Sequence, residues 1–187
     1  MDLHKFGIKL FFKPNENYNS KDFISELHRW IQNGSFPEHM LIDVVDYSHI
    51  LDGPGIMLIA HEAHFSMDQE NHESGILYMR KIELNGNFTE RLEKVFQTSI
   101  QMAKMLSQYS KNEELKWILN AFRFIANDRR LAHNNQKNRK LYSKLVKIFL
   151  NEKYPTSNWE ITGYTGGNER LAFTINFTDD TNIFKQY

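Results

Sequence analysis

Apolar and polar residues alternate along two segments, residues 6–13 and 171–177, close to opposite ends of the chain. A period of two is typical of a β-strand with one buried face. In the first segment Lys9 and Lys13 stand on the polar side. We expect the apolar side chains of both strands to face one common core. They are Phe6, Ile8, Leu10, Phe12, Leu171, Phe173, Ile175 and Phe177.

Three other segments space their apolar residues three and four positions apart, as in an amphipathic helix. They lie at about residues 20–33, 87–106 and 137–149. Asn19 or Ser20 suits the start of the first helix, and Gly34 suits its end. Asn87 and Glu90 have the spacing of a capping box at the start of the second. These signals predict three helices with one buried side each.

The middle of the first half predicts further strands. Residues 40–46 and 56–60 are apolar on both faces, so we expect both strands to lie inside the sheet. Past Ala60 the alternation continues to Met67, and we expect the same strand to extend there while leaving the core. A polar loop at residues 69–74 then precedes a strand at 75–81.

Two segments of the second half give signals of another kind, an ambiguous apolar pattern at residues 112–126 and a glycine-rich turn at residues 165–168. Leu115, Ile118 and Leu119 fit a helix, whereas Phe122 and Phe124 alternate with polar neighbours as in a strand. The pattern of residues 112–126 leaves both structures open, and we favour a strand over its second half because aromatic residues favour strands. Residues 165–168, with two glycines, predict a tight hairpin turn between strands at 159–164 and 171–177.

The predicted order is β-α-β-β-β-α followed by β-α-β-β. We therefore expect an α+β fold in which helices pack on a largely antiparallel sheet. Each half, roughly residues 1–110 and 111–187, contains a β-α-β-β-type unit. A chain of 187 residues fits a single α+β domain covering residues 1–187.

Composition removes several classes of function. The chain has no cysteine, which excludes a thiolate nucleophile, a zinc finger and a disulfide scaffold. Lys+Arg and Asp+Glu are equal at 23 each, so the charge as a whole does not favour nucleic acid or an anionic membrane. The longest apolar run, Ile56–Ala60, is too short to span a bilayer. With no signal-peptide pattern at the start, we expect a cytoplasmic protein without membrane contact.

Six short segments of the sequence stand out together: 7–12 (GIKLFF), 28–32 (HRWIQ), 41–47 (LIDVVDY), 53–55 (GPG), 61–62 (HE) and 127–129 (NDR). With these segments the chain resembles an uncharacterised family of bacterial proteins. The resemblance spans most of the chain, and it implies no activity, cofactor or catalytic residue.

Four of the eight histidines lie between residues 49 and 72, near several carboxylates. Imidazole and carboxylate are suitable ligands for zinc or iron. The spacing opposes such a site, because His61 and His64 would point to opposite faces of a strand. Only Glu62 and His64 share a side, and two ligands do not make a catalytic metal centre. We therefore predict no metal and no cofactor.

Two polar loops are the best candidates for a ligand site, because loops at strand ends commonly present functional side chains. The first, residues 46–55, follows a strand and contains a glycine-rich turn. The second, residues 127–135, follows the segment at 112–126. If the two halves pack symmetrically, these loops border one cleft. The candidate ligand-binding residues are Asp46, His49, His61, Glu62, Asp128, Arg129 and His133. Arg129 would suit a small anionic ligand through its planar guanidinium.

Basic residues outnumber acidic ones between Arg123 and Lys153, and four lysines at positions 137, 140, 144 and 147 form one stripe on the third helix. Such a stripe can contact phosphates, an acidic partner or a second copy in a homodimer. It is more often the solvated side of the helix, and nucleic acid is the less favoured partner.

The sequence leaves three functions open. The favoured one is a small-ligand-binding or regulatory module. The second is an enzyme that uses Asp, His and Glu around residues 46–64 as acid and base. The third is an interaction protein that uses the basic helix. The chain contains no phosphate-binding loop, dinucleotide fingerprint or serine nucleophile elbow.

Overall fold

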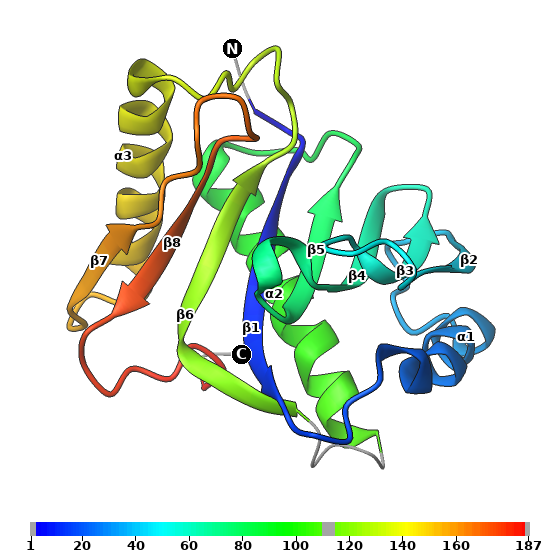
Figure 1. Cartoon of the computed structure of the whole chain (residues 1–187). Coiled ribbons are helices and arrows are strands. Elements are labelled where there is room, and N and C mark those ends of the chain that lie inside the picture. Colours follow the sequence, from blue (N-terminus) through cyan, green and yellow to red (C-terminus); the bar gives the residue numbers. More distant parts are fainter. Residues whose placement is uncertain (1–2, 110–114, 186–187) are drawn as a thin grey trace.

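The computed structural model describes residues 3–109 and 115–185, and within these ranges eight strands form one sheet (Figure 1). Every neighbouring pair is antiparallel, in the order β2-β3-β4-β5-β1-β6-β8-β7. The strands are β1 (Phe6–Pro14), β2 (Leu41–Tyr47), β3 (Gly55–Ala60), β4 (Ala63–Asp68), β5 (Gly75–Arg80), β6 (Leu115–Ala126), β7 (Trp159–Thr162) and β8 (Ala172–Phe177). The α-helices are α1 (Ile24–Asn33), α2 (Phe88–Gln108) and α3 (Gln136–Lys153), and the short 3-10 helices are η1 (Ser20–Phe23) and η2 (Glu70–His72).

The fold is α+β with helices packed on an antiparallel sheet, which confirms the predicted class. The second half follows the predicted order as β6-α3-β7-β8. The first half contains one strand more than expected. β1 is central, because β5 pairs with one of its edges and β6 with the other. None of the described helices is long and apolar enough to cross a membrane.

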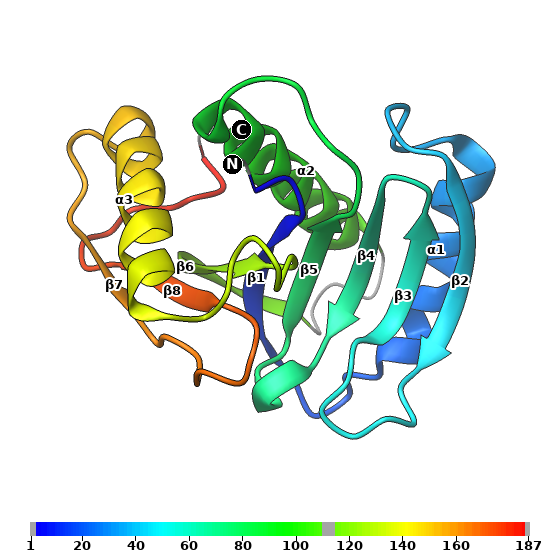
Figure 2. The ribbon, with the colours of Figure 1, turned by 90° about the horizontal axis from the view of Figure 1, so that it is seen from above.

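The three helices cover one face of the sheet (Figure 2). α2 packs on β1 and β5, α1 packs on β2, and α3 contacts α2. All eight apolar side chains that the alternation assigned to a common core are buried there. Because a fully buried large apolar side chain stabilises a fold by about 1.5–3 kcal/mol, this layer holds the sheet and the helices together.

The helix ends follow the local signals in the sequence. Gly34 ends α1 in the left-handed conformation, at φ 57°, which favours a residue without Cβ. Asn87 and Glu90 form the expected capping box at the start of α2. Asn19 caps the first helical turn through Lys21 N, and that turn is the 3-10 helix η1, which leads directly into α1.

The strand predicted to run on past Ala60 is in fact two antiparallel strands. β3 ends at Ala60, His61 and Glu62 form the turn, and β4 begins at Ala63. Because of this turn, the apolar side chains that the alternation placed on one face of a single strand lie on opposite faces of the sheet. Met57 and Ile59 point away from the helices, whereas Phe65 points toward them. A turn of polar residues without Gly or Pro gave no signal for the break.

β2 lies at the edge of the sheet, and the prediction that it is an interior strand was wrong. α1 covers one of its faces, and the other is open, with Ile42 55% exposed. A run of β-branched residues therefore indicated a strand without indicating two covered faces. β3, the other strand of this prediction, is interior.

Residues 115–126 form one long strand, β6, including the first half for which a helix also fitted. Residues 112–114 lie outside the described ranges. The glycine pair at 166–167 does not make a tight hairpin, because β7 ends at Thr162 and β8 begins at Ala172. The connection 163–171 is longer than a tight turn, and four of its residues line the site described next.

Candidate functional site

The sheet face opposite the helices is covered by connections between strands (Figure 2). Its centre contains a small buried apolar cluster of Leu77 and Met79 from β5, Ile125 from β6 and Ala172 from β8. Connections 69–74, 127–135 and 163–171 fold over this face and bury it. We call it the loop-covered face. The three connections that cover this face are far apart in the sequence, so the cover depends on long-range contacts.

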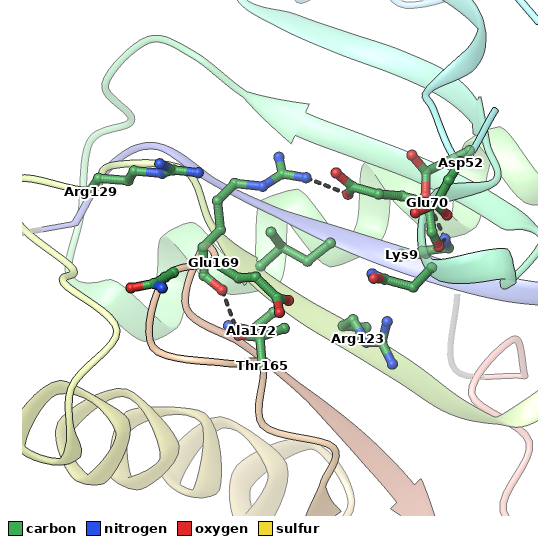
Figure 3. Close-up of a pocket in the computed structure, with 13 residues that line it drawn as sticks. Lys9, Asp52, Glu70, Arg123, Arg129, Thr165, Glu169 and Ala172 are labelled. Atoms are coloured by element: carbon green, nitrogen blue, oxygen red, sulfur yellow. Dashed lines mark hydrogen bonds and ion pairs between the residues drawn. The ribbon is translucent and has the colours of Figure 1, made fainter. Parts of the chain in front are cut away.

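The connections leave a cavity of about 240 Å³ on the loop-covered face (Figure 3). Its floor is formed by Lys9 of β1, Arg123 and Ile125 of β6, and Ala172 of β8. The remaining lining residues are Asp52, Asp68, Glu70, Asn71, Arg129, Thr165, Asn168, Glu169 and Arg170. Pockets for drug-sized molecules occupy about 300–1,000 Å³, so this cavity suits a smaller, polar ligand.

A buried ion pair lies in the floor. The ammonium of Lys9 contacts the carboxylate of Asp68, and the two side chains are 1% and 3% exposed. Lys9 Nζ also donates a hydrogen bond to the carbonyl oxygen of Glu70 at 3.2 Å. A charge this far from water requires a partner, because desolvating a lone ion costs several kcal/mol. The contact therefore ties the beginning of the β4–β5 connection to the central strand.

Residues 69–74, which connect β4 to β5, form what we call the strap, and two of its carboxylates form ion pairs with arginines of the cavity lining. Glu70 pairs with Arg170, which lies a hundred residues further along the chain. Glu73 pairs with Arg123 through both guanidinium Nη atoms, with the Nη2–Oε1 distance at 3.1 Å. The Nε of Arg123 donates to Thr174 Oγ1 at 3.0 Å, which fixes the plane of the guanidinium. The strap is thus held to β6 and to the connection 163–171 by charge.

The connection 163–171 is held in place independently of the strap. Thr165 Oγ1 donates to the carbonyl of Arg170 and accepts from the backbone N–H of Ala172 at 3.1 Å. Arg139 of α3 donates to the carbonyl of Thr165 at 2.6 Å, and Asn134 donates to the same carbonyl at 3.2 Å. These contacts give the cavity one fixed wall, which carries Arg170.

Arg129 lines the cavity and has no ion-pair or hydrogen-bond partner among the described residues. In Figure 3 its side chain lies across the cavity from Lys9 and Asp52, and Arg170 belongs to the same lining. The other three cations of the lining, Lys9, Arg123 and Arg170, each contact a carboxylate. Arg129 is therefore the cation of this cavity whose charge is still available for a ligand.

The two loops predicted to share a cleft lie at opposite ends of the strands. The 46–55 loop is at the end where β1 finishes, and the 127–135 loop is where β1 starts, as the registers of β2 to β6 show. Each still contributes one residue to the cavity, Asp52 from the first and Arg129 from the second. The symmetry argument thus gave a wrong geometry, and of the predicted residues Arg129 alone lines this cavity.

The other predicted loop residues have local structural roles. Asp46 accepts from Ser48 N and pairs with Lys21, and these contacts, led by Ser48, lower its pKa. Asp128 accepts from the backbone N–H groups of Arg130 and Leu131 and so shapes its own loop. His49 lines a separate surface hollow beside Lys21. His133 is exposed, and its carbonyl accepts from Asn138 Nδ2.

His61 and Glu62 form the β3–β4 turn, away from the cavity. Glu62 accepts from the backbone N–H of Met40 at 2.8 Å and faces His61 Nδ1 at 3.2 Å. Desolvation raises the pKa of Glu62, but the Met40 N–H and His61 outweigh it, and the net shift is downward. Among the described residues, no three His, Asp or Glu side chains converge in a way that would hold a metal ion.

A polar cluster near this turn was missed by the sequence reasoning. His39 Nε2 is 2.8 Å from the hydroxyl of Tyr78, and a guanidinium nitrogen of Arg80 lies 3.5 Å from both atoms. Burial, helped by Arg80, lowers the pKa of His39, and burial raises that of Tyr78. The ring of His39 also packs against Phe36 and Phe65. These aromatic contacts indicate a neutral histidine that closes the edge of the core.

No protein-family model matches this chain, and no curated protein matches it.

Proposed function

We propose that this protein is a small-ligand-binding or regulatory module whose cavity on the loop-covered face takes a small anion. One observation carries the proposal: Arg129 lines the cavity without a partner among the described residues, in a lining that also contains Arg170. A planar guanidinium binds carboxylate and phosphate oxygens through paired N–H groups. Thr165 and Asn168 add polar atoms to the same lining.

The acid–base enzyme considered for residues 46–64 has less support. Asp46, His49 and Glu62 each contact different neighbours, and general acid–base catalysis requires the groups to share one substrate. The basic helix of the third alternative has its four lysines exposed to solvent. Its arginine, Arg139, is engaged with Thr165. These contacts favour a helix that supports the cavity wall.

The test is an NMR titration of the ¹⁵N-labelled protein with inorganic phosphate. We expect saturable shifts in the amides of residues 127–135 and 165–172. Arg129→Ala should weaken binding about tenfold or more, because a hydrogen bond to a charged group contributes roughly 1.5–3 kcal/mol. The melting temperature should stay nearly unchanged, since the side chain supports no fold contact.

Arg130→Ala is the matched control, because it removes the same charge from an exposed neighbour outside the cavity lining. It should leave phosphate binding within about twofold, a difference too small to reflect a lost direct contact. Shifts that never saturate, or equal losses in the two variants, would count against a specific anion site.

A further inference from the structure

In both ion pairs between the strap and the cavity lining, the carboxylate is more exposed to solvent than the arginine. Arg123 is 11% exposed and its partner Glu73 is 41% exposed, while Arg170 is 27% exposed and its partner Glu70 is 39% exposed. The cations belong to the sheet and to the fixed wall. The carboxylates reach them from the solvent side. Glu70 and Glu73 therefore occupy the places that the anionic groups of a ligand would take.

The backbone of the strap is in an unfavourable conformation. Three residues other than glycine in the described part of the chain have positive φ: Asp52 at 59°, Asn71 at 63° and His72 at 55°. Asn71 and His72 are consecutive members of the strap, and Asp52 Oδ1 accepts the N–H of His72 at 3.0 Å. Left-handed backbone costs a residue with Cβ roughly 1–2 kcal/mol, less for Asn and Asp, so His72 carries most of this cost, and such strain often lies at functional sites. The ion pairs offset this cost.

Arg123 also links the cavity to a second hollow on the same face. A space of about 500 Å³, lined in part by Phe11, Glu73 and Thr174, begins where the Arg123–Glu73 pair lies. The guanidinium of Arg123 lies 5.4 Å from the ring centroid of Phe11. Glu73 therefore lies between the Arg123 guanidinium of the cavity and the second hollow.

We propose that the strap is a displaceable internal ligand, and that the natural ligand is a small molecule with two anionic groups that replace Glu70 at Arg170 and Glu73 at Arg123. This inference rests on the anion-binding function proposed above and names its ligand class and its control. When the ligand binds, the strap turns outward and the His72–Asp52 hydrogen bond opens. When the strap has turned outward, the loop-covered face presents a different surface. A change of surface on ligand binding is how a regulatory module would signal to a partner.

The experiment compares the wild type with the double variant Glu70→Gln/Glu73→Gln, using succinate and pyrophosphate as separate probes in NMR titrations. Amide side chains keep the size of the carboxylates and remove the charge that competes with the ligand. In the wild type the ligand must displace two partly exposed ion pairs, which should weaken its binding about tenfold. The double variant should therefore bind the better probe about tenfold more tightly. The probe that gains more identifies the ligand as a dicarboxylate or as a phosphorylated compound.

Glu169→Gln is the matched control. Glu169 lines the same cavity and has no ion-pair partner among the described residues, so its replacement removes one carboxylate charge, half of that removed by the double variant, without releasing an arginine. We expect it to change affinity by less than about threefold. An equal gain in this variant would overturn the inference, because it would show a general effect of charge.

Hydrogen exchange gives a second measurement that needs no variant. In the wild type, the amide of His72 should exchange faster once succinate or pyrophosphate is added, because its acceptor Asp52 is lost. Slower exchange would overturn the inference by showing that the strap closes on the ligand. Should the double variant not fold, this measurement and the single variant Glu73→Gln decide the question.

The two proposals fail in different ways. If neither the wild type nor the double variant binds phosphate, succinate or pyrophosphate, the anion-binding function is wrong and the strap inference falls with it. If the wild type binds a probe and the double variant binds it no more tightly, the anion site stands and the displaceable strap is wrong.

Discussion

Replacing Lys9 by Met tests the buried ion pair under the cavity. The substitution removes the ammonium that contacts Asp68 and the Glu70 carbonyl, and it keeps most of the apolar stem. Asp68, at 3% exposure, then has a charge far from water and without its counterion. Breaking a buried pair by removing one partner costs about 3–5 kcal/mol. We expect a loss of this size in the free energy of unfolding, measured in urea at pH 7.

Two further variants show whether the loss comes from the unpaired charge. Lys9→Met combined with Asp68→Leu removes both ions, and it should recover stability to within about 1–2 kcal/mol of the wild type, since apolar replacements of buried pairs are often neutral. Lys5→Met, at the exposed position just before β1, should change stability by less than about 0.5 kcal/mol. A loss below about 1 kcal/mol for Lys9→Met would refute the reasoning, because Asp68 would then be hydrated.

Two other predictions concern the core and the pH dependence. Phe173→Ala should destabilise the protein by about 3–5 kcal/mol in urea unfolding, because its fully buried ring packs on Phe124, and a loss near 0.5 kcal/mol would contradict its place in the core. Burial holds the pKa of His39 below its ordinary value of 6.5, so below that pH the unfolded chain binds more protons and stability should fall as the pH drops. Stability measured between pH 7.5 and 5.5 should fall less in His39→Gln than in the wild type, and parallel curves would show that His39 is not involved.

The fold was predictable wherever a local pattern of residues reports one side of an element. The apolar residues from Leu171 to Phe177 alternate because one side of β8 faces the helix-covered core, and Asn87 with Glu90 marks the start of α2 through a contact within one turn. β2 was misplaced for the opposite reason. Its exposed Ile42 looks like a core residue, and only the sheet order shows that no strand lies beyond it in the described part of the chain.

Of the residues that line the candidate site, the sequence predicted Arg129. The other lining residues come together from segments that are distant in the sequence. The alternation placed Lys9 on a polar, solvated face, yet it is buried because the strap and residues 163–171 fold over it. Glu70 and Arg170 are a hundred residues apart, and no local pattern relates them. Glutamates in a polar loop and an arginine after two glycines each look ordinary when read alone.

The central position of β1 has a consequence for the order in which the protein is made. β1 is synthesised before both of its neighbours, which are β5 and β6, and β6 begins only at residue 115. Until β6 leaves the ribosome, one edge of β1 presents its backbone N–H and C=O groups without a partner strand. Pairing at such sequence separations is slow, and an unpaired edge invites association with other chains. The nascent chain is therefore most vulnerable to aggregation just before β6, the sixth strand in chain order, pairs with β1 in the middle of the sheet.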